Sequence, residues 1–178
     1  MLGMRASLTL LTAAFLLSSP LAYAGKYHSA PFSQPQDHAN AVAASRDFTA
    51  DKTQDLVLYA LSLNGTRYKF GGTNIDTGFD CSGFVRYVYE QVAGLTLPRS
   101  ARSISQAGAQ VAKNEIQPGD LVFFNTLRRA FSHVGIYLGE NRFIHASSAS
   151  SGDVMVSDLS EKYWSQRFNG ARRYALAE

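Results

Sequence analysis

The chain contains a single cysteine, Cys81, in the stretch "TGFDCSGFVRYVYEQ". An apolar helical pattern follows it, and Asp80, directly before it, is a good N-cap for a helix that begins at Cys81. The amide groups of a helix N-terminus favour a thiolate, so we expect Cys81 to have a lowered pKa and to act as a nucleophile, although a charged Asp80 would oppose this. The alternatives are an inert buried thiol or a bridge to another molecule, since one cysteine cannot form an internal disulfide.

Two histidines could complete such a site. His133 and His145 lie in neighbouring predicted strands, "SHVGIYLG" and "NRFIHAS". A three-residue hairpin loop at 139–141 pairs position 135 with 145, which puts both rings on one face as diagonal neighbours roughly 7–8 Å apart. A loop of even length would put them on opposite faces.

On one face, the two histidines and the cysteine could perform acyl transfer. His133 would accept the thiol proton, His145 would orient His133, and the backbone N–H of Cys81 would stabilise the oxyanion before a thioester forms. Two alternatives remain from the residues alone. Both histidines could be core residues, or they could bind zinc with Cys81 as a third ligand.

The elements that must position these residues are helices first and strands later. Helices are predicted over about 51–63 and from Cys81 to the glycine at 94. Short alternating or apolar runs bounded by turns predict five strands, in "PGDLVFF", "SHVGIYLG", "NRFIHAS", "DVMVSDL" and "NGARRYALA". This order predicts an α+β fold with an antiparallel sheet.

Length and composition restrict the class of protein and its partners. The chain has 178 residues, of which 46% are apolar and 17% charged, as expected for one globular domain with a real core. The net charge of +3 is mild and no run of lysines and arginines occurs, so we expect no nucleic-acid partner.

The N-terminus has the pattern of a secretory signal peptide over residues 1–24. A positive Arg5 precedes an apolar stretch over 8–17 and the small-residue site Ala22-Tyr23-Ala24. We expect cleavage before Gly25, a flexible arm over 25–50 and a domain over 51–178. No cysteine lies near the cleavage site and the apolar stretch is short for a membrane span. We therefore expect a periplasmic or secreted protein without a lipid or integral membrane anchor.

Several motifs occur in the order and spacing of one family, namely "YKFGG", "FDCSGFVRYVY", "LPRSA", "PGDLVFF", "SHVGIYLG" and "FIHAS". In these motifs, over about residues 54–174, the chain resembles the NlpC/P60 family of bacterial cell-wall cysteine peptidases. The resemblance implies a papain-like fold, in which the cysteine-bearing helix packs on an antiparallel sheet that carries the histidines. It also implies hydrolysis of peptidoglycan stem peptides, usually between γ-D-glutamate and diaminopimelate, and in some members of D-Ala–diaminopimelate cross-links.

By position, the resemblance implies roles for individual residues. Cys81 matches the nucleophile, His133 the base and His145 the third, orienting residue. Tyr68 matches the tyrosine that borders the substrate beside the cysteine. Asp80 and Ser82 match positions that line the subsite for the free amino end of the stem peptide. Their simpler roles are a helix cap and a first-turn residue.

The resemblance implies no cofactor and no metal, and we expect a monomer. A non-catalytic wall-binding module, and another acyl-transfer activity on the same scaffold, are the competing hypotheses. Arg128 and Arg129, before the second predicted strand, could contact anionic substrate groups, but the pattern favours solvated charges.

Overall fold

The computed structural model describes residues 35–126, 128–148 and 152–176, and over most of 35–49 it describes the backbone only. The predicted signal peptide, 1–24, and the start of the predicted arm, 25–34, lie outside these residues. The elements are, in chain order, α1 (Pro35–Ser62), β1 (Thr73–Asn74), β2 (Gly78–Phe79), α2 (Cys81–Ala93), α3 (Ala101–Ser105), β3 (Ala109–Val111), the 3-10 turn η1 (Lys113–Glu115), β4 (Leu121–Phe124), β5 (His133–Gly139), β6 (Arg142–Ala146), β7 (Val154–Asp158), α4 (Lys162–Ser165) and β8 (Phe168–Arg173). Within the same ranges, no helix is both long and apolar enough to cross a membrane.

Six strands form one antiparallel sheet in the order β3-β8-β4-β5-β6-β7, and β1 and β2 form a separate small hairpin. The predicted α+β class and all five predicted strands are confirmed. The edge strand β3 was not predicted, because its three residues are too short to show alternation.

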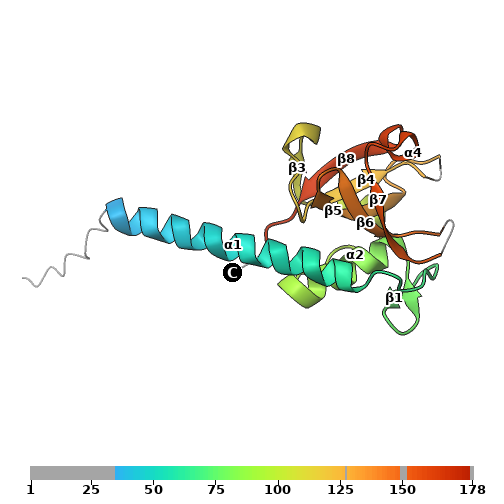
Figure 1. Ribbon diagram of the computed structural model, residues 1–178, viewed down its shortest axis with the longest axis horizontal. Coiled ribbons are helices and arrows are strands. Elements are labelled where there is room, and N and C mark those ends of the chain that lie inside the picture. Colours follow the sequence, from blue (N-terminus) through green and yellow to red (C-terminus); the bar gives the residue numbers. More distant parts are fainter. Residues whose placement is uncertain (1–34, 127, 149–151, 177–178) are drawn as a thin grey trace, which may run out of the picture. The chain divides into compact units, whose positions relative to one another are not determined.

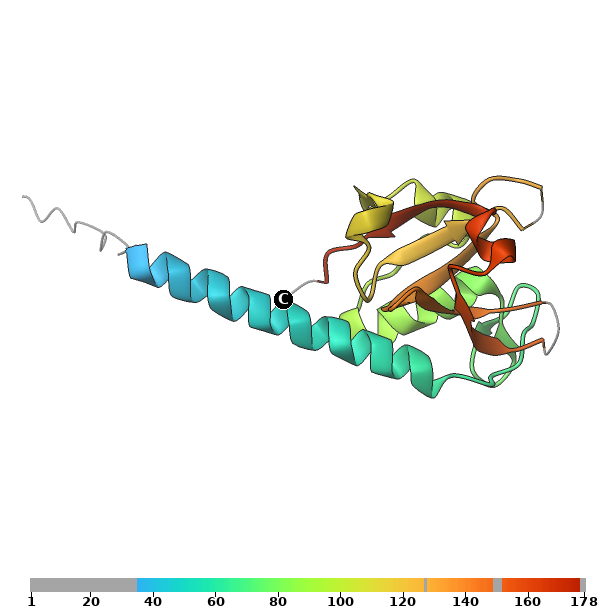
Figure 2. The ribbon, with the colours of Figure 1, turned by 45° about the horizontal axis from the view of Figure 1, so that its top comes forward.

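Helices α1 and α2 lie against one face of the sheet, with α2 between α1 and the strands (Figures 1 and 2). In α2 the predicted apolar stripe is buried, with Phe84, Val85 and Val88 fully enclosed. The helix ends at Gly94, whose φ of 62° is the left-handed conformation that glycine adopts without cost. This packing holds the first residue of α2, Cys81, close to the middle strands.

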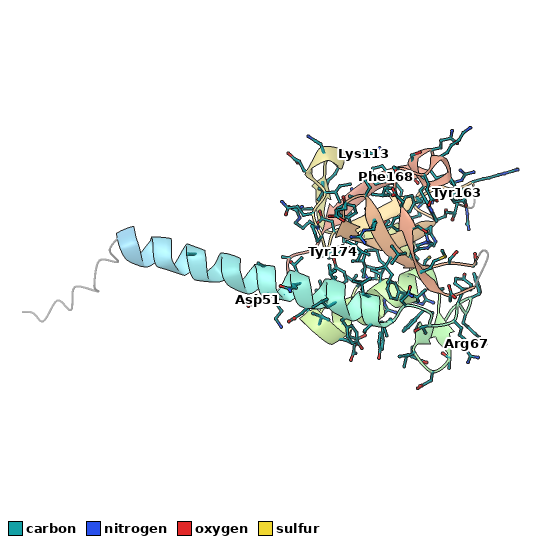
Figure 3. The ribbon with its side chains drawn as sticks, in the orientation of Figure 1. Asp51, Arg67, Lys113, Tyr163, Phe168 and Tyr174 are labelled. Carbon is teal, nitrogen blue, oxygen red and sulfur yellow. The ribbon has the colours of Figure 1, made fainter. Side chains whose placement is uncertain are left out.

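The opposite face of the sheet carries a second apolar cluster, made by Val111, Val122, Phe124, Phe143, Leu159, Trp164 and Ala171. Helix α4 covers it, and Figure 3 shows Tyr163 and Phe168 on this side of the molecule, away from Arg67 in the loop before β1. The sheet is therefore buried on both faces.

Helix α1 begins earlier than predicted. The sequence predicted a flexible arm to residue 50, whereas the backbone is helical from Pro35. Proline suits the first position of a helix and the following segment is rich in alanine, which favours helix without any apolar periodicity. Leu56, Ala60 and Leu63, which lie at helical spacing, are buried and form the contact face of α1.

Candidate active site

Cys81 is the first residue of α2, and Asp80 is the N-cap, as predicted. One Asp80 carboxylate oxygen, Oδ1, accepts the backbone N–H of Gly83 at 2.6 Å. Cys81 is half-buried, and the backbone N–H groups of Val134, Ser82 and Cys81 itself stabilise its thiolate form. Because Val134 follows His133, its contact with the sulfur places Cys81 beside the start of β5.

The two predicted histidines meet on one face of the β5–β6 hairpin. His133 Nε2 lies 2.8 Å from His145 Nδ1, and on the far side of the second ring His145 Nε2 lies 3.0 Å from Ser157 Oγ in β7. With Nε2 of His133 occupied, its Nδ1 is the nitrogen left to exchange a proton with a thiol. The structure thus joins three side chains in a relay of hydrogen bonds that ends at Ser157, a residue that was not predicted.

The hairpin reaches the predicted register by a different turn. Ile136 pairs with Ile144, as the predicted three-residue loop requires, but Gly139 pairs with Arg142 and a bulge interrupts the ladder before it. The turn has only two residues, Glu140 and Asn141, with φ of 51° and 60°, which are typical of a type I′ hairpin turn. The bulge adds the residue that a two-residue turn lacks, so both histidines stay on one face.

Burial makes both histidines weak bases. It lowers the pKa of His133 to about 4, and burial together with the nearby His133 lowers the pKa of His145 to about 2. Trp164, in α4, covers both rings, with centroids 5.7 Å from His133 and 4.9 Å from His145. The contact of Trp164 with the histidine pair has no local sequence signal.

The expected thiol pKa is corrected by the structure. Burial, followed by the charge of Asp80, raises the pKa of Cys81 to about 11, and the opposing amide groups do not overcome these two effects. The sequence showed the helix N-terminus but not how much apolar side chain surrounds the sulfur. Near neutral pH the resting pair is therefore a neutral thiol and a neutral imidazole, so the proton must move as the sulfur attacks.

Asp80 and Ser82 are joined by a residue that the prediction missed. Arg99 in the "LPRSA" motif binds both carboxylate oxygens of Asp80, at 2.6 and 3.1 Å, and the hydroxyl of Ser82 at 2.9 Å. Burial acts to raise the pKa of Asp80, but hydrogen bonds from Arg99, the Gly83 N–H and Ser82 hold it below its usual value. Because Arg99 already neutralises Asp80, a substrate ammonium group would have to share this carboxylate.

Tyr68 also lies near the cysteine. It is half-buried, and burial followed by the charges of Cys81 and Asp80 raises its pKa, which places its hydroxyl within electrostatic range of both. A backbone bridge from Tyr68 to Phe79 ties this loop to the strand before α2. All six residues predicted for the site therefore belong to one region of the fold.

The loop that carries Tyr68 is held against α2 by a close approach of two glycines. A Cβ added at Gly83 would lie 2.0 Å from the carbonyl oxygen of Gly72. The same carbonyl accepts the N–H of Asp80 at 3.1 Å, and Gly71 donates its N–H to Asp80 Oδ2 at 3.1 Å. The absence of a side chain at Gly83 is therefore what allows the loop to sit on the helix start.

The zinc alternative finds no support in this geometry. The facing nitrogens of His133 and His145 bond to each other and do not converge on a third point. Across the described ranges, no three side chains of histidine, cysteine, aspartate or glutamate gather as a metal site.

The buried histidines predict a loss of stability in acid. Their folded pKa values are lower than the ordinary 6.5, so the unfolded chain binds protons first as the pH falls below 6.5. We expect His133 alone to remove about 3 kcal/mol of unfolding free energy between pH 6.5 and 4. Urea unfolding at several pH values measures this, and His133→Gln should give a shallower pH dependence. Parallel curves for the two proteins would contradict the prediction.

The comparisons with known proteins agree with this geometry. The match to the NlpC/P60 family spans residues 65–173. The chain is 48% identical over 111 residues to the gamma-DL-glutamyl hydrolase of Bacillus subtilis (strain 168), covering 62% of this chain and 26% of that protein. It is 45% identical over 112 residues to the murein DD-endopeptidase MepS/murein LD-carboxypeptidase of Escherichia coli (strain K12), covering 61% of this chain and 56% of that protein.

A solved structure shows the same fold. The crystal structure of a protein described as similar to lipoprotein, of the NLP/P60 family, from Staphylococcus aureus subsp. aureus Mu50 superposes with a TM-score of 0.62. It is 38% identical and the match covers 69% of this chain and 41% of that one. Fold and site together define a papain-like domain with a thiol and an imidazole pair. Because the family match spans more than half of its length, the chain belongs to the NlpC/P60 family.

Proposed function

We propose that this protein is a cysteine endopeptidase that hydrolyses peptide bonds in peptidoglycan stem peptides, with the γ-D-glutamyl–diaminopimelate bond as its target. Two observations carry the proposal: His133 and His145 form a hydrogen-bonded pair, and the Cys81 sulfur at a helix start is contacted by the N–H of Val134, the residue after His133. The name of the Bacillus subtilis relative, a gamma-DL-glutamyl hydrolase, supports a γ-glutamyl bond.

The proposed reaction has two acyl-transfer steps, in which Cys81 is the nucleophile and His133 transfers the proton. Cys81 Sγ attacks the carbonyl carbon while its proton passes to His133 Nδ1, and the Cys81 N–H stabilises the oxyanion. The C–N bond then breaks, the amine leaves with the proton from His133, and a thioester remains. Water gives a proton to His133 as it attacks the thioester, and the departing thiolate takes that proton back.

A second target is the D-Ala–diaminopimelate cross-link. The name of the Escherichia coli relative, a murein DD-endopeptidase and LD-carboxypeptidase, favours it. Purified sacculi digested with the protein and with Cys81→Ala, followed by mass spectrometry of the fragments, test both. Cleavage within stem peptides or at cross-links selects the bond, and the absence of cleavage by the unchanged protein would overturn the proposal.

The setting of the reaction is also proposed. The signal-peptide pattern of residues 1–24 supports export to the periplasm or the medium, where peptidoglycan lies. The action needs no cofactor, and a monomer would suffice because the nucleophile and both histidines come from one chain.

Ser157 should orient the relay. In the tautomers that leave His133 Nδ1 free to accept the thiol proton, His145 Nε2–H donates to Ser157 Oγ. Replacing Ser157 by alanine removes that acceptor, so we expect kcat to fall about tenfold with little change in KM. Ser157→Thr should restore activity because it keeps the hydroxyl. Steady-state kinetics on a stem peptide measure this. The control is Ser160→Ala, because Ser160 is exposed and donates hydrogen bonds within its own turn, to Asp158. Unchanged kcat in Ser157→Ala would show that the hydroxyl does not matter.

A further inference from the structure

Two adjoining hollows lie between α3 and the loop that joins β4 to β5. The smaller, of about 290 Å³, has Ser100 and Ser132 in its lining, and the larger, of about 520 Å³, shares Arg102 and Phe131 with it. Ser100 directly follows Arg99, which holds Asp80, and Ser132 directly precedes His133. The lining of the smaller hollow therefore includes the sequence neighbours of two residues of the candidate active site, Arg99 and His133.

The walls of these hollows carry positive charge without a counter-charge. Arg102 and Arg129 line the smaller hollow, Arg102 and Arg172 line the larger one, and neither lining includes an acidic residue. Arg172 donates to the backbone carbonyls of Ser105 and Ala171, which leaves its charge uncompensated. The side chains of Arg102 and Arg129 are exposed and make no hydrogen bond or ion pair within the described part of the chain.

The wall shared by the two hollows has an unusual backbone. Phe131 has a φ of 56°, a left-handed conformation that costs a bulky residue on the order of 1 kcal/mol or more. Two contacts hold it there. Its N–H donates to Asn169 Oδ1 at 2.9 Å, and its ring packs edge-on against Phe123 at 5.9 Å between centroids. Because these contacts hold Phe131 in a strained conformation, the wall that it forms has a defined position.

We propose that this surface, the arginine groove of Arg102, Arg129, Phe131 and Arg172, binds the free carboxylates of an acidic peptide substrate next to the bond that is cut. The inference rests on the proposed function, because a γ-linked glutamate keeps a free α-carboxylate that three carbon atoms separate from the reacting carbonyl. A guanidinium group binds such a carboxylate through two parallel hydrogen bonds, and unpaired arginines at the edge of a hollow can do so without breaking an existing pair. The sequence context of Arg129 favoured a solvated charge, whereas in this proposal Arg129 binds a substrate carboxylate.

Kinetics on a pair of peptides test the groove. Both peptides are L-Ala-γ-D-Glu-diaminopimelate, one with a free glutamate α-carboxylate and one with the α-amide. We expect the unchanged protein to prefer the carboxylate in kcat/KM, and the double variant Arg102→Gln/Arg129→Gln to lose about tenfold or more of that preference. Arg142→Gln is the matched control, since Arg142 is exposed on β6 and pairs with Glu140. Equal effects of the double variant on both peptides, or none, would overturn the proposal.

A binding measurement separates this proposal from the proposed function. Titration of the Cys81→Ala protein with the same two peptides, followed by NMR, should show tighter binding of the carboxylate form, and the two arginine substitutions should abolish the difference. If the preference is found in binding but the unchanged protein cleaves neither peptide, the groove stands and the peptidase activity does not. If both peptides are cleaved without an arginine-dependent preference in rate or binding, the peptidase activity stands and the groove does not. If the Cys81→Ala protein binds neither peptide, the proposal that the groove binds carboxylates is overturned.

Discussion

Replacement of His133 by alanine is expected to lower kcat for stem-peptide hydrolysis by about three to four orders of magnitude. The thiol of Cys81 has a pKa of about 11, so near pH 7 almost none of it is ionised, and attack requires a base at the moment of reaction. His133 is the residue whose free Nδ1 can serve, since its other nitrogen is bonded to His145. The loss should appear in kcat more than in KM, because a neutral imidazole contributes little to substrate binding.

The control for this prediction uses the nucleophile. Cys81→Ala should lose activity to a similar extent, and the double variant Cys81→Ala/His133→Ala should be no worse than either single one, because the two residues act as one unit. Since His133 is buried, His133→Gln is made in parallel and each variant is checked for cooperative unfolding. A folded His133→Ala protein within tenfold of the original kcat would show that another group takes the proton.

Replacement of Gly83 by alanine is expected to destabilise the domain by about 3 kcal/mol or more. Helix propensity alone predicts the opposite sign, since alanine in place of glycine within a helix gains about 1 kcal/mol. The added Cβ would lie 2.0 Å from the carbonyl oxygen of Gly72, which is backbone and cannot rotate away. The loop of Tyr68 would have to leave the start of α2, so activity should fall along with stability.

Denaturant unfolding measures this effect, with Gly65→Ala as a steric control. Gly65 has a φ of 81° but nothing within 4 Å of an added Cβ, so only the conformational cost of about 1 kcal/mol applies. If Gly83→Ala unfolds at the same denaturant concentration as the original protein, the loop does not sit on the helix as the structure shows.

Local sequence patterns were sufficient to predict the helix and the hairpin that carry the candidate site. The N-cap at Asp80, the helix that starts at Cys81 and its stop at Gly94 depend on residues that are neighbours along the chain. The hairpin register was also predicted, because a three-residue loop pairs the same strand residues as the two-residue turn and bulge that the structure has. The turn itself was predicted with the wrong length, since alternation reports on the strands and not on a bulge at their end.

Local patterns could not predict the residues whose partners are distant in the sequence. Arg99 lies 19 positions from Asp80, and Ser157 lies 12 positions from His145 on another strand. An arginine in a loop and a serine in a strand look like solvated residues until the chain is folded. Trp164 contacts the two histidines because α4 is placed over the sheet, and no local pattern indicates this contact.

The sequence by itself determined the candidate residues of the site and the elements on which they lie. Cysteine at a helix start and two histidines in register on a hairpin follow from spacing, because capping and alternation are local. The tertiary structure alone decided how these groups ionise. Whether the thiol of Cys81 is favoured by its helix or disfavoured by burial depends on the surrounding side chains, and burial prevails, as it does for His133. Desolvation is a sum over contacts from the whole chain, so no stretch of sequence contains it.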